Sequence, residues 1–182
     1  MKYYISDLHF DHYNIIQFCN RPFVTCQEMY ETIAAKWNSK VTPEDEVYIL
    51  GDVAFTNNPN KIVEMLKKLN GKKYLVKGNH DKIMLDQRVM KQFEWVKMYE
   101  EINDNDRRVV LFHFPIEDWN GKFRGSYHLF GHIHNNWSVI HGHIPHRYNV
   151  SADVLDFCPM SLDELCIYYK ISDEQTKGVI NA

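Results

Sequence analysis

Short hydrophobic runs recur along the chain, and most of them end in a polar residue. They are rich in β-branched and aromatic residues, which is typical of buried strands. The pattern predicts strands at Lys2–Ser6, Glu46–Leu50, Lys73–Lys77, Arg108–Phe112 and Tyr127–Phe130, with a last pair near Arg147–Ser151 and Leu165–Lys170.

The segment after the first run has the pattern of an amphipathic helix. Thr25 and Glu28 have the spacing of a capping box, which predicts that the helix begins at Thr25. Met29, Ile33 and Trp37 then recur at intervals of four residues and form one apolar stripe.

Two further helices are expected between the strands. One runs from about Asn60 to Leu69 and is closed by the turn-forming Asn70-Gly71, and another runs from about Lys82 to Phe93. Ser161 and Glu164 repeat the capping-box spacing, but the aromatic run after them favours a strand, so only a short turn is expected there.

Strands that alternate with helices, followed by a strand-rich half, predict a layered α/β fold with mixed β-sheets flanked by helices. No repeat, low-complexity tract or Pro/Gly/Ser-rich linker interrupts the sequence, so a single domain is expected over residues 1–182. With 45% hydrophobic and 25% charged residues, the composition is that of a globular protein and excludes a disordered one.

Composition also limits the location and the partners. No apolar run reaches the ~20 residues that span a bilayer, and the N-terminus turns polar too early for a signal peptide, so a cytoplasmic location is expected. The four cysteines form no CxxC pair, which favours reduced thiols over a zinc–thiolate site. A net charge of -3 argues against long nucleic acid as a partner, whereas a small phosphorylated substrate remains compatible. The oligomeric state stays open.

Polar side chains that can bind metals follow the predicted strands. They are Asp7 and His9, Asp52, Asn79 with His80, His113, and His132 with His134. Residues just past strand ends converge on one edge of a sheet, where α/β proteins bind ligands. Carboxylate, amide and imidazole groups without thiolates suit Mn, Fe, Zn or Ni. Seven potential ligands, counted without His80, are too many for one ion and suit two ions ~3.5–4 Å apart that share a carboxylate.

The order of these motifs resembles the calcineurin-like metallophosphoesterase superfamily over residues 5–134, and more loosely beyond. The matching blocks are Asp7-Leu8-His9, Gly51-Asp52, Gly78-Asn79-His80-Asp81, His113 and Gly131-His132-Ile133-His134. Asn20-Arg21-Pro22-Phe23 and His113-Phe114-Pro115 are similar to compact bacterial and phage members that lack an accessory domain.

The resemblance implies a site with two divalent ions, Mn being the first expectation. Asp7, His9, Asp52 and His134 would hold one ion, and Asp52, Asn79, His113 and His132 the other, so that Asp52 is the bridge. His80 would be the general acid or would stabilise the transition state, oriented by Asp81. A hydroxide between the ions would attack phosphorus in line.

Each of several other residues has two alternative roles, one in substrate binding and one in the structure of the protein. His12 and Asn14 either reach a substrate phosphate or brace their loop, and Arg21 either binds a phosphate or forms a salt bridge. Phe23 and Trp119 either stack on a nucleobase or pack internally. A second histidine group, His128, His141, His143 and His146, is interpreted as a solvated loop, and residues 149–153 are expected to close the sheet.

The sequence therefore predicts a phosphodiesterase acting on a small nucleotide-like or cyclic phosphate. A phosphomonoesterase for nucleotides or proteins is the alternative. It is less favoured because a dianionic monoester benefits from extra cations, and the sequence offers only Arg21 and Arg124 as candidates. A non-catalytic metal-binding scaffold is a third possibility, but such a module would be expected to lose a ligand or His80.

Overall fold

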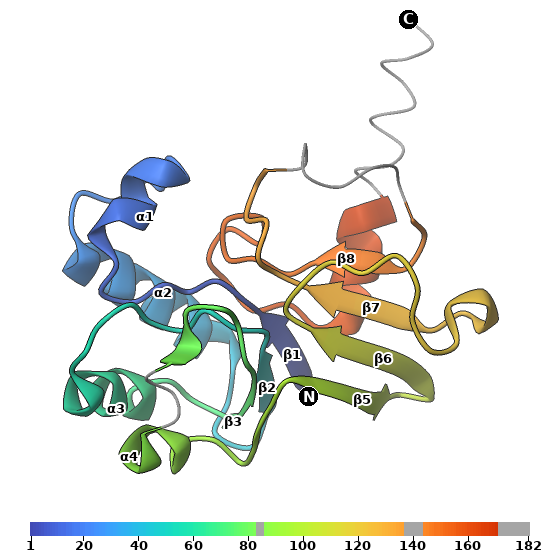
Figure 1. Ribbon diagram of the computed structural model, residues 1–182, viewed down its shortest axis with the longest axis horizontal. Helices are drawn as coiled ribbons and strands as arrows, with labels where there is room; N and C mark the ends of the chain where they lie inside the picture. Colours follow the sequence, from blue (N-terminus) through green and yellow to red (C-terminus); the bar gives the residue numbers. More distant parts are fainter. Residues whose placement is uncertain (83–85, 137–143, 171–182) are drawn as a thin grey trace, which may run out of the picture.

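The computed structural model describes residues 1–82, 86–136 and 144–170, and within them eight strands form two four-stranded sheets (Figure 1). The first sheet contains β1 (Lys2–Ile5), β2 (Glu46–Ile49), β3 (Lys72–Val76) and β4 (Val96–Lys97), in that order and all parallel. The second contains β5 (Tyr99–Asp104), β6 (Arg107–Phe112), β7 (Tyr127–Phe130) and β8 (Arg147–Asn149), with β5 antiparallel to β6 and the others parallel. This confirms a layered α/β fold with a mixed sheet.

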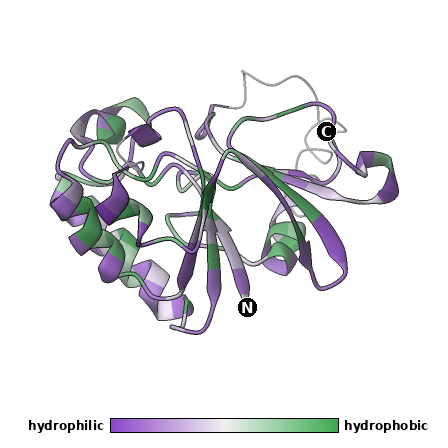
Figure 2. Cartoon of the chain, turned by 60° about the horizontal axis from the view of Figure 1, so that its bottom comes forward, coloured by the Kyte–Doolittle hydropathy of each residue, from purple (hydrophilic) through white to green (hydrophobic). Residues whose placement is uncertain are grey.

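Four helices cover the first sheet on the side away from the second sheet (Figure 1). They are α1 (Tyr13–Phe18), α2 (Cys26–Lys40), α3 (Pro59–Lys67) and α4 (Gln87–Met90). A 3-10 helix spans Lys122–Arg124, and a further helix at residues 162–170 lies beside the second sheet. Hydrophobic residues line the central strands, whereas the helices mix hydrophobic and hydrophilic positions (Figure 2). None of the helices within residues 1–82, 86–136 and 144–170 has the length and hydrophobicity needed to cross a membrane.

Alternation along the strands divides the core into two clusters. Tyr3 and Ile5 of β1 join the cluster beneath the helices, which also contains the predicted α2 stripe around Ile33. Tyr4, between them, points to the other face and joins a cluster that includes Leu111 and residues from both sheets. Because successive residues of a strand point to opposite faces, one short apolar strand supplies both cores.

Most predicted elements are confirmed, but one helix is shorter, one predicted strand is helical, and α1, β4 and β5 were not predicted. Thr25 caps α2 by accepting a hydrogen bond from the Glu28 N–H. A helix is predicted from about Lys82 to Phe93. In the described residues it begins at Gln87, where the Asp86 side chain is the N-cap, and it ends at Met90. The strand β5 was not predicted, since it is a polar, half-exposed edge strand with little hydrophobic signal.

The predicted strand at Leu165–Lys170 is wrong, because residues 162–170 are helical. Ser161 and Glu164 form a reciprocal capping box: the Glu164 N–H donates to Ser161 Oγ, and the Ser161 N–H donates to Glu164 Oε2. Leu162, Leu165 and Tyr169 are buried against the sheets, as expected for positions on one face of a helix. The capping signal therefore outweighs the β-propensity of the aromatic residues that follow it.

The two interpretations of this segment make different predictions for stability. In a strand, residues 165 and 167 would share a face, whereas in the helix Leu165 is fully buried and Ile167 is 61% exposed. We expect Leu165→Ala to lower the free energy of unfolding by about 2–5 kcal/mol and Ile167→Ala by less than about 0.5 kcal/mol. Urea denaturation measures both, and equal losses for the two variants would contradict the helical assignment.

Candidate metal centre and active site

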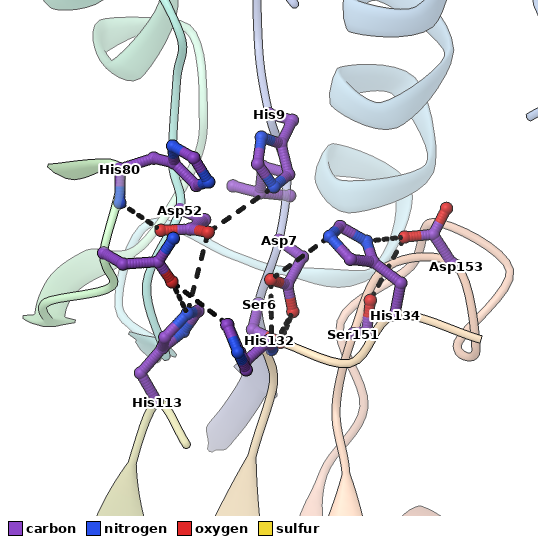
Figure 3. Close-up of polar contacts among 12 residues, drawn as sticks. Ser6, Asp7, His9, Asp52, His80, His113, His132, His134, Ser151 and Asp153 are labelled. Carbon is purple, nitrogen blue, oxygen red and sulfur yellow. Dashed lines mark hydrogen bonds and ion pairs between the residues drawn. The ribbon is translucent and has the colours of Figure 1, made fainter. Parts of the chain in front are cut away.

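The candidate site lies where the carboxyl ends of both sheets meet (Figure 3). Asp7 follows β1 and Asp52 follows β2, while His113 and His132 follow β6 and β7 of the second sheet. Backbone hydrogen bonds join the two sheets here, because the Ser6 N–H donates to Val150 O at 2.8 Å. The segments that carry the ligands are therefore still hydrogen-bonded to one another where they leave the strands.

Most of these ligands have an unusual backbone conformation. Positive φ angles of 55° at Asp7, 51° at His9, 55° at Asp52, 71° at His132 and 49° at His134 place them in the left-handed region. Such conformations cost free energy in residues other than glycine and concentrate at functional sites. The sharp turns direct side chains from successive positions into the same small space.

Glycines allow the loops to approach the ligands. A Cβ atom at Gly78 would lie 2.1 Å from Asp52 Oδ1, and one at Gly131 would lie 2.3 Å from Asp7 Oδ2. Both distances are far below van der Waals contact. The glycines before the metal-binding motifs are therefore required by space, because any side chain there would displace a carboxylate.

Asp52 lies between the ligands of the two sheets. Its Oδ2 is 3.6 Å from His9 Nε2 and 3.6 Å from His113 Nε2. The Asn79 Oδ1 atom is 3.1 Å from His113 Nε2 and 3.0 Å from His132 Nδ1. These positions bring together ligands that are far apart in the sequence, such as His9 and His132, which are 123 positions apart.

The donor atoms fit divalent ions. Two donors that bind one ion at about 2.1 Å are about 3.0–3.4 Å apart in octahedral or tetrahedral geometry, close to the separations in the site. The atom His9 Nε2 is buried without a hydrogen-bond partner, which a metal ion would supply. Among the described residues, three sets of donors lie within 4.8 Å of one another: Asp7 with His9 and His134, Asp7 with Asp52 and His113, and Cys19 with His134 and Asp153. Asp7 belongs to two of these sets, so it is close to ligands expected for either ion, in addition to the expected bridge Asp52.

Hydrogen bonds to the second nitrogen orient two of the histidines. The His113 Nδ1–H donates to Leu50 O at 2.7 Å, and the His134 Nδ1–H donates to Asp153 Oδ2 at 2.7 Å. Both bonds leave Nε2 facing the site. Histidine ligands commonly use such a partner to fix the ring and its tautomer.

Asp153 is itself held by a buried guanidinium. Arg21 donates from Nε and Nη2 to the two carboxylate oxygens of Asp153, each at 2.8 Å, and donates further to the carbonyl oxygens of Asp7 and Leu8. Burial alone would lower the pKa of His134, but the bond to Asp153 raises it to about 10 in the metal-free protein. Burial opposes ionisation of Asp153, yet His134 and Arg21 hold its pKa below the ordinary value.

The structure decides between the two roles of Arg21 and adds to the role expected of residues 149–153. Arg21 is buried behind the metal site and makes an internal salt bridge, so it is not placed to bind a substrate phosphate. Residues 149–153 do more than close the sheet, because the Asn149 side chain donates to His134 O and Asp153 orients the His134 ring. Sequence pattern gave no signal for a pair that joins Arg21 to Asp153 across 132 positions.

The neighbours His80 and Asp81 have different environments. The His80 side chain is exposed at the rim, while its backbone N–H donates to Asp52 Oδ1 at 2.9 Å. Asp81 is fully buried and accepts from the backbone N–H groups of Asp52, Val53 and Gly78. Burial raises the pKa of Asp81, although these hydrogen bonds act in the opposite direction. Asp81 thus braces the loops rather than orienting the His80 ring, which corrects its expected catalytic role.

The remaining candidates are divided between rim and interior. Trp119 is only 7% exposed and its Nε1–H donates to Ser126 Oγ, so it packs internally and is not available for stacking. Phe23 is half-buried and packs edge-on against Phe157. His12 is half-buried, with Nδ1 3.1 Å from His9 Nδ1, and Asn14 is exposed. For His12 and Asn14 a substrate contact stays a prediction.

The second histidine group is not one solvated loop. His128 is buried between Trp119 and Phe130, and burial lowers its pKa to about 4. His146 stacks on Tyr127. His141 and His143 lie outside the described residues.

The profile of the family described as calcineurin-like phosphoesterase matches residues 3–172. The chain belongs to this family. An uncharacterized protein of Methanocaldococcus jannaschii is 38% identical over 165 residues, which cover 88% of this chain and 86% of the relative. The gene 66 protein of Mycobacterium phage L5 is 32% identical over 81 residues, which cover 43% of this chain and 39% of that protein.

A solved structure has the same fold. It is the crystal structure of a protein of unknown function from Aquifex aeolicus, with a TM-score of 0.72 and 28% sequence identity, covering 90% of this chain and 96% of that one. Membership of the family makes the chain a phosphoesterase-type hydrolase with a divalent-metal site, which agrees with the donor atoms described above.

The contacts of Asp153 predict its effect on metal binding. We expect Asp153→Asn to weaken Mn²⁺ binding by about 10–100-fold, because His134 loses its charged partner. It should also lower stability, since Arg21 stays buried without an opposite charge. Calorimetric titration of the folded variant measures the affinity. Asp156→Asn, whose carboxylate is 84% exposed, is the matched control, and an unchanged affinity in Asp153→Asn would contradict the prediction.

Proposed function

We propose that this protein is a two-metal phosphodiesterase that hydrolyses a small nucleotide-like substrate, with Mn²⁺ as its first candidate ion and Fe, Zn or Ni as alternatives. We further propose that it acts in the cytoplasm and does not use long nucleic acid as a partner. The observation that carries the proposal is the arrangement of Asp52, whose Oδ2 lies 3.6 Å from a histidine nitrogen on each side.

The residues on each side would hold one ion. Asp7, His9, Asp52 and His134 are assigned to the first ion, and Asp52, Asn79, His113 and His132 to the second. Two such ions activate a water and neutralise charge on the phosphoryl group. The protein's own groups then have to bind the ester and manage the proton of the leaving alcohol.

His80 is suited to donate that proton. Its ring is exposed at the rim, 5.6 Å from the His9 ring between centroids, and its backbone is anchored to Asp52. It is therefore fixed beside the ions without being buried among them. A histidine in this position can protonate an alkoxide as the phosphorus–oxygen bond breaks.

The charges around the site support a diester rather than a monoester. Arg21 is paired behind the ligands, and Arg124 lines a hollow with Arg107 and Arg108 that contains no metal ligand. Among the described residues that line the hollows beside the metal site, Lys82 is the only lysine or arginine. A monoester dianion would gain little from such surroundings beyond the ions themselves. The scaffold alternative is disfavoured because all seven ligands and His80 are present.

A comparison of two substrates tests the proposal. With Mn²⁺ added, we expect a higher kcat/KM for bis(p-nitrophenyl) phosphate than for p-nitrophenyl phosphate, and loss of both activities in a chelator. A preference for the monoester would favour the phosphatase alternative. Metal binding without turnover of any phosphoester would favour the scaffold.

The role of His80 is testable by varying the leaving group. We expect His80→Ala to slow hydrolysis of an unactivated alkyl diester by about 10²–10⁴-fold, but to slow a nitrophenyl diester far less, because nitrophenolate leaves without a proton. Metal content should be unchanged, since His80 is not assigned as a ligand. His146→Ala serves as a control, because His146 stacks on Tyr127 outside the site. Equal rates for the variant and the wild type on the alkyl diester would exclude His80 as the acid.

A further inference from the structure

Two hollows adjoin the metal centre, and they share no lining residue. One, of about 540 Å³, is lined by Phe18, Cys19, Phe114, Pro115 and residues 132–136. The other, of about 460 Å³, is lined by residues 54–57, Asn79, His80 and Lys82. Volumes of this size accommodate small organic groups. The second hollow differs from the first because it contains the proposed proton donor.

Phe55 forms an aromatic surface in the second hollow. It is 49% exposed, although its backbone is fixed by a hydrogen bond from its N–H to Phe10 O at 2.8 Å. One face of its ring stacks on His12, with centroids 4.3 Å apart and planes at 23°. His80 contacts the ring edge-on, at 5.5 Å and 71°. Contacts with two histidines thus hold this phenylalanine in place, while 49% of the residue stays exposed beside His80.

We propose that the exposed surface of Phe55 binds an aromatic ring in the leaving alcohol of the substrate. In the reaction, a water oxygen forms a bond to phosphorus and loses a proton to solvent. The bond from phosphorus to the leaving oxygen breaks, and that oxygen takes a proton from His80. The leaving alcohol therefore lies next to His80, which is in the hollow of Phe55. Thr56, Asn57 and Lys82 supply polar groups around a ring placed there.

This inference rests on the proposed function and narrows its substrate class. In a cyclic nucleotide the leaving oxygen also belongs to a nucleoside, although it stays attached to the phosphoryl group through the second ester. The Phe55 surface therefore favours diesters, cyclic or acyclic, in which the leaving oxygen belongs to a group with a planar ring, as in a nucleoside. Stacking on an aromatic side chain tolerates any base, since every base has a π-face.

The test compares two diesters that release methyl phosphate and differ in the leaving alcohol. These are methyl phenyl phosphate and methyl hexafluoroisopropyl phosphate, whose aliphatic alcohol is similarly acidic. We expect Phe55→Ala to lower kcat/KM about tenfold for the phenyl ester, and less than about twofold for the fluoroalkyl ester. Phe55→Trp should restore the preference for the phenyl ester. Phe123→Ala, which removes a phenylalanine that is 91% exposed elsewhere, should change neither rate.

The outcomes separate the inference from the proposed function. Equal losses for both esters, or no loss in Phe55→Ala, would overturn the role of Phe55 while leaving the phosphodiesterase intact. If the wild type hydrolyses only monoesters, the diester proposal fails, and phenyl phosphate against hexafluoroisopropyl phosphate makes the same comparison for Phe55. Failure to hydrolyse any of the four esters would overturn both. Thermal unfolding of each variant shows whether a loss reflects misfolding instead.

Discussion

Two buried carboxylates, Asp7 and Asp52, share the small space where the sheets meet, and the rest of the site depends on that constraint. Burial raises the pKa of Asp7, and the nearby charge of Asp52 adds to the effect. Two anions without water are costly unless positive charge and hydrogen-bond donors compensate them. The donors come from backbone N–H groups, such as those of His132 to Asp7 and of His80 to Asp52. The remaining charge is what two divalent ions would neutralise.

Keeping these groups in place requires a second set of buried charges. Arg21 and Asp153 form an ion pair behind His134. Asp81 accepts hydrogen bonds from backbone N–H groups of the loops after β2 and β3. Left-handed backbone at Asp7 and Asp52 has to be maintained by these contacts, because it is unfavourable on its own. These contacts position the ligands without the help of an ion. Such preorganisation reduces the reorganisation needed when charge develops in a transition state.

Local signals made part of this structure predictable. Apolar runs predict the buried strands, and the polar residues that end them predict the candidate metal ligands, because both signals depend on neighbouring residues. The helix at residues 162–170 is not predicted, because the aromatic residues after Ser161 favour a strand while the capping box favours a helix. The edge strand β5 was missed because its pairing with β6 leaves Glu100 and Glu101 half-exposed, without a hydrophobic pattern.

Contacts between residues far apart in the sequence could not be predicted from local signals, and they decide which residues are free to contact a substrate. Arg21 carries a guanidinium group, which can bind a phosphate. Its salt bridge with Asp153, 132 residues away in the sequence, holds it in the interior instead of at the rim. Asp81, next to His80 in sequence, is turned into the interior, while Phe55, which has no motif, is held at the surface by His12. The rim is consequently less cationic than the sequence suggests, and its aromatic surface comes from Phe55 rather than from Phe23 or Trp119. A rim of that kind contributes little to binding a second phosphate charge and more to binding the organic groups of an ester, which is the physical reason to favour a diester with a ring in its leaving alcohol.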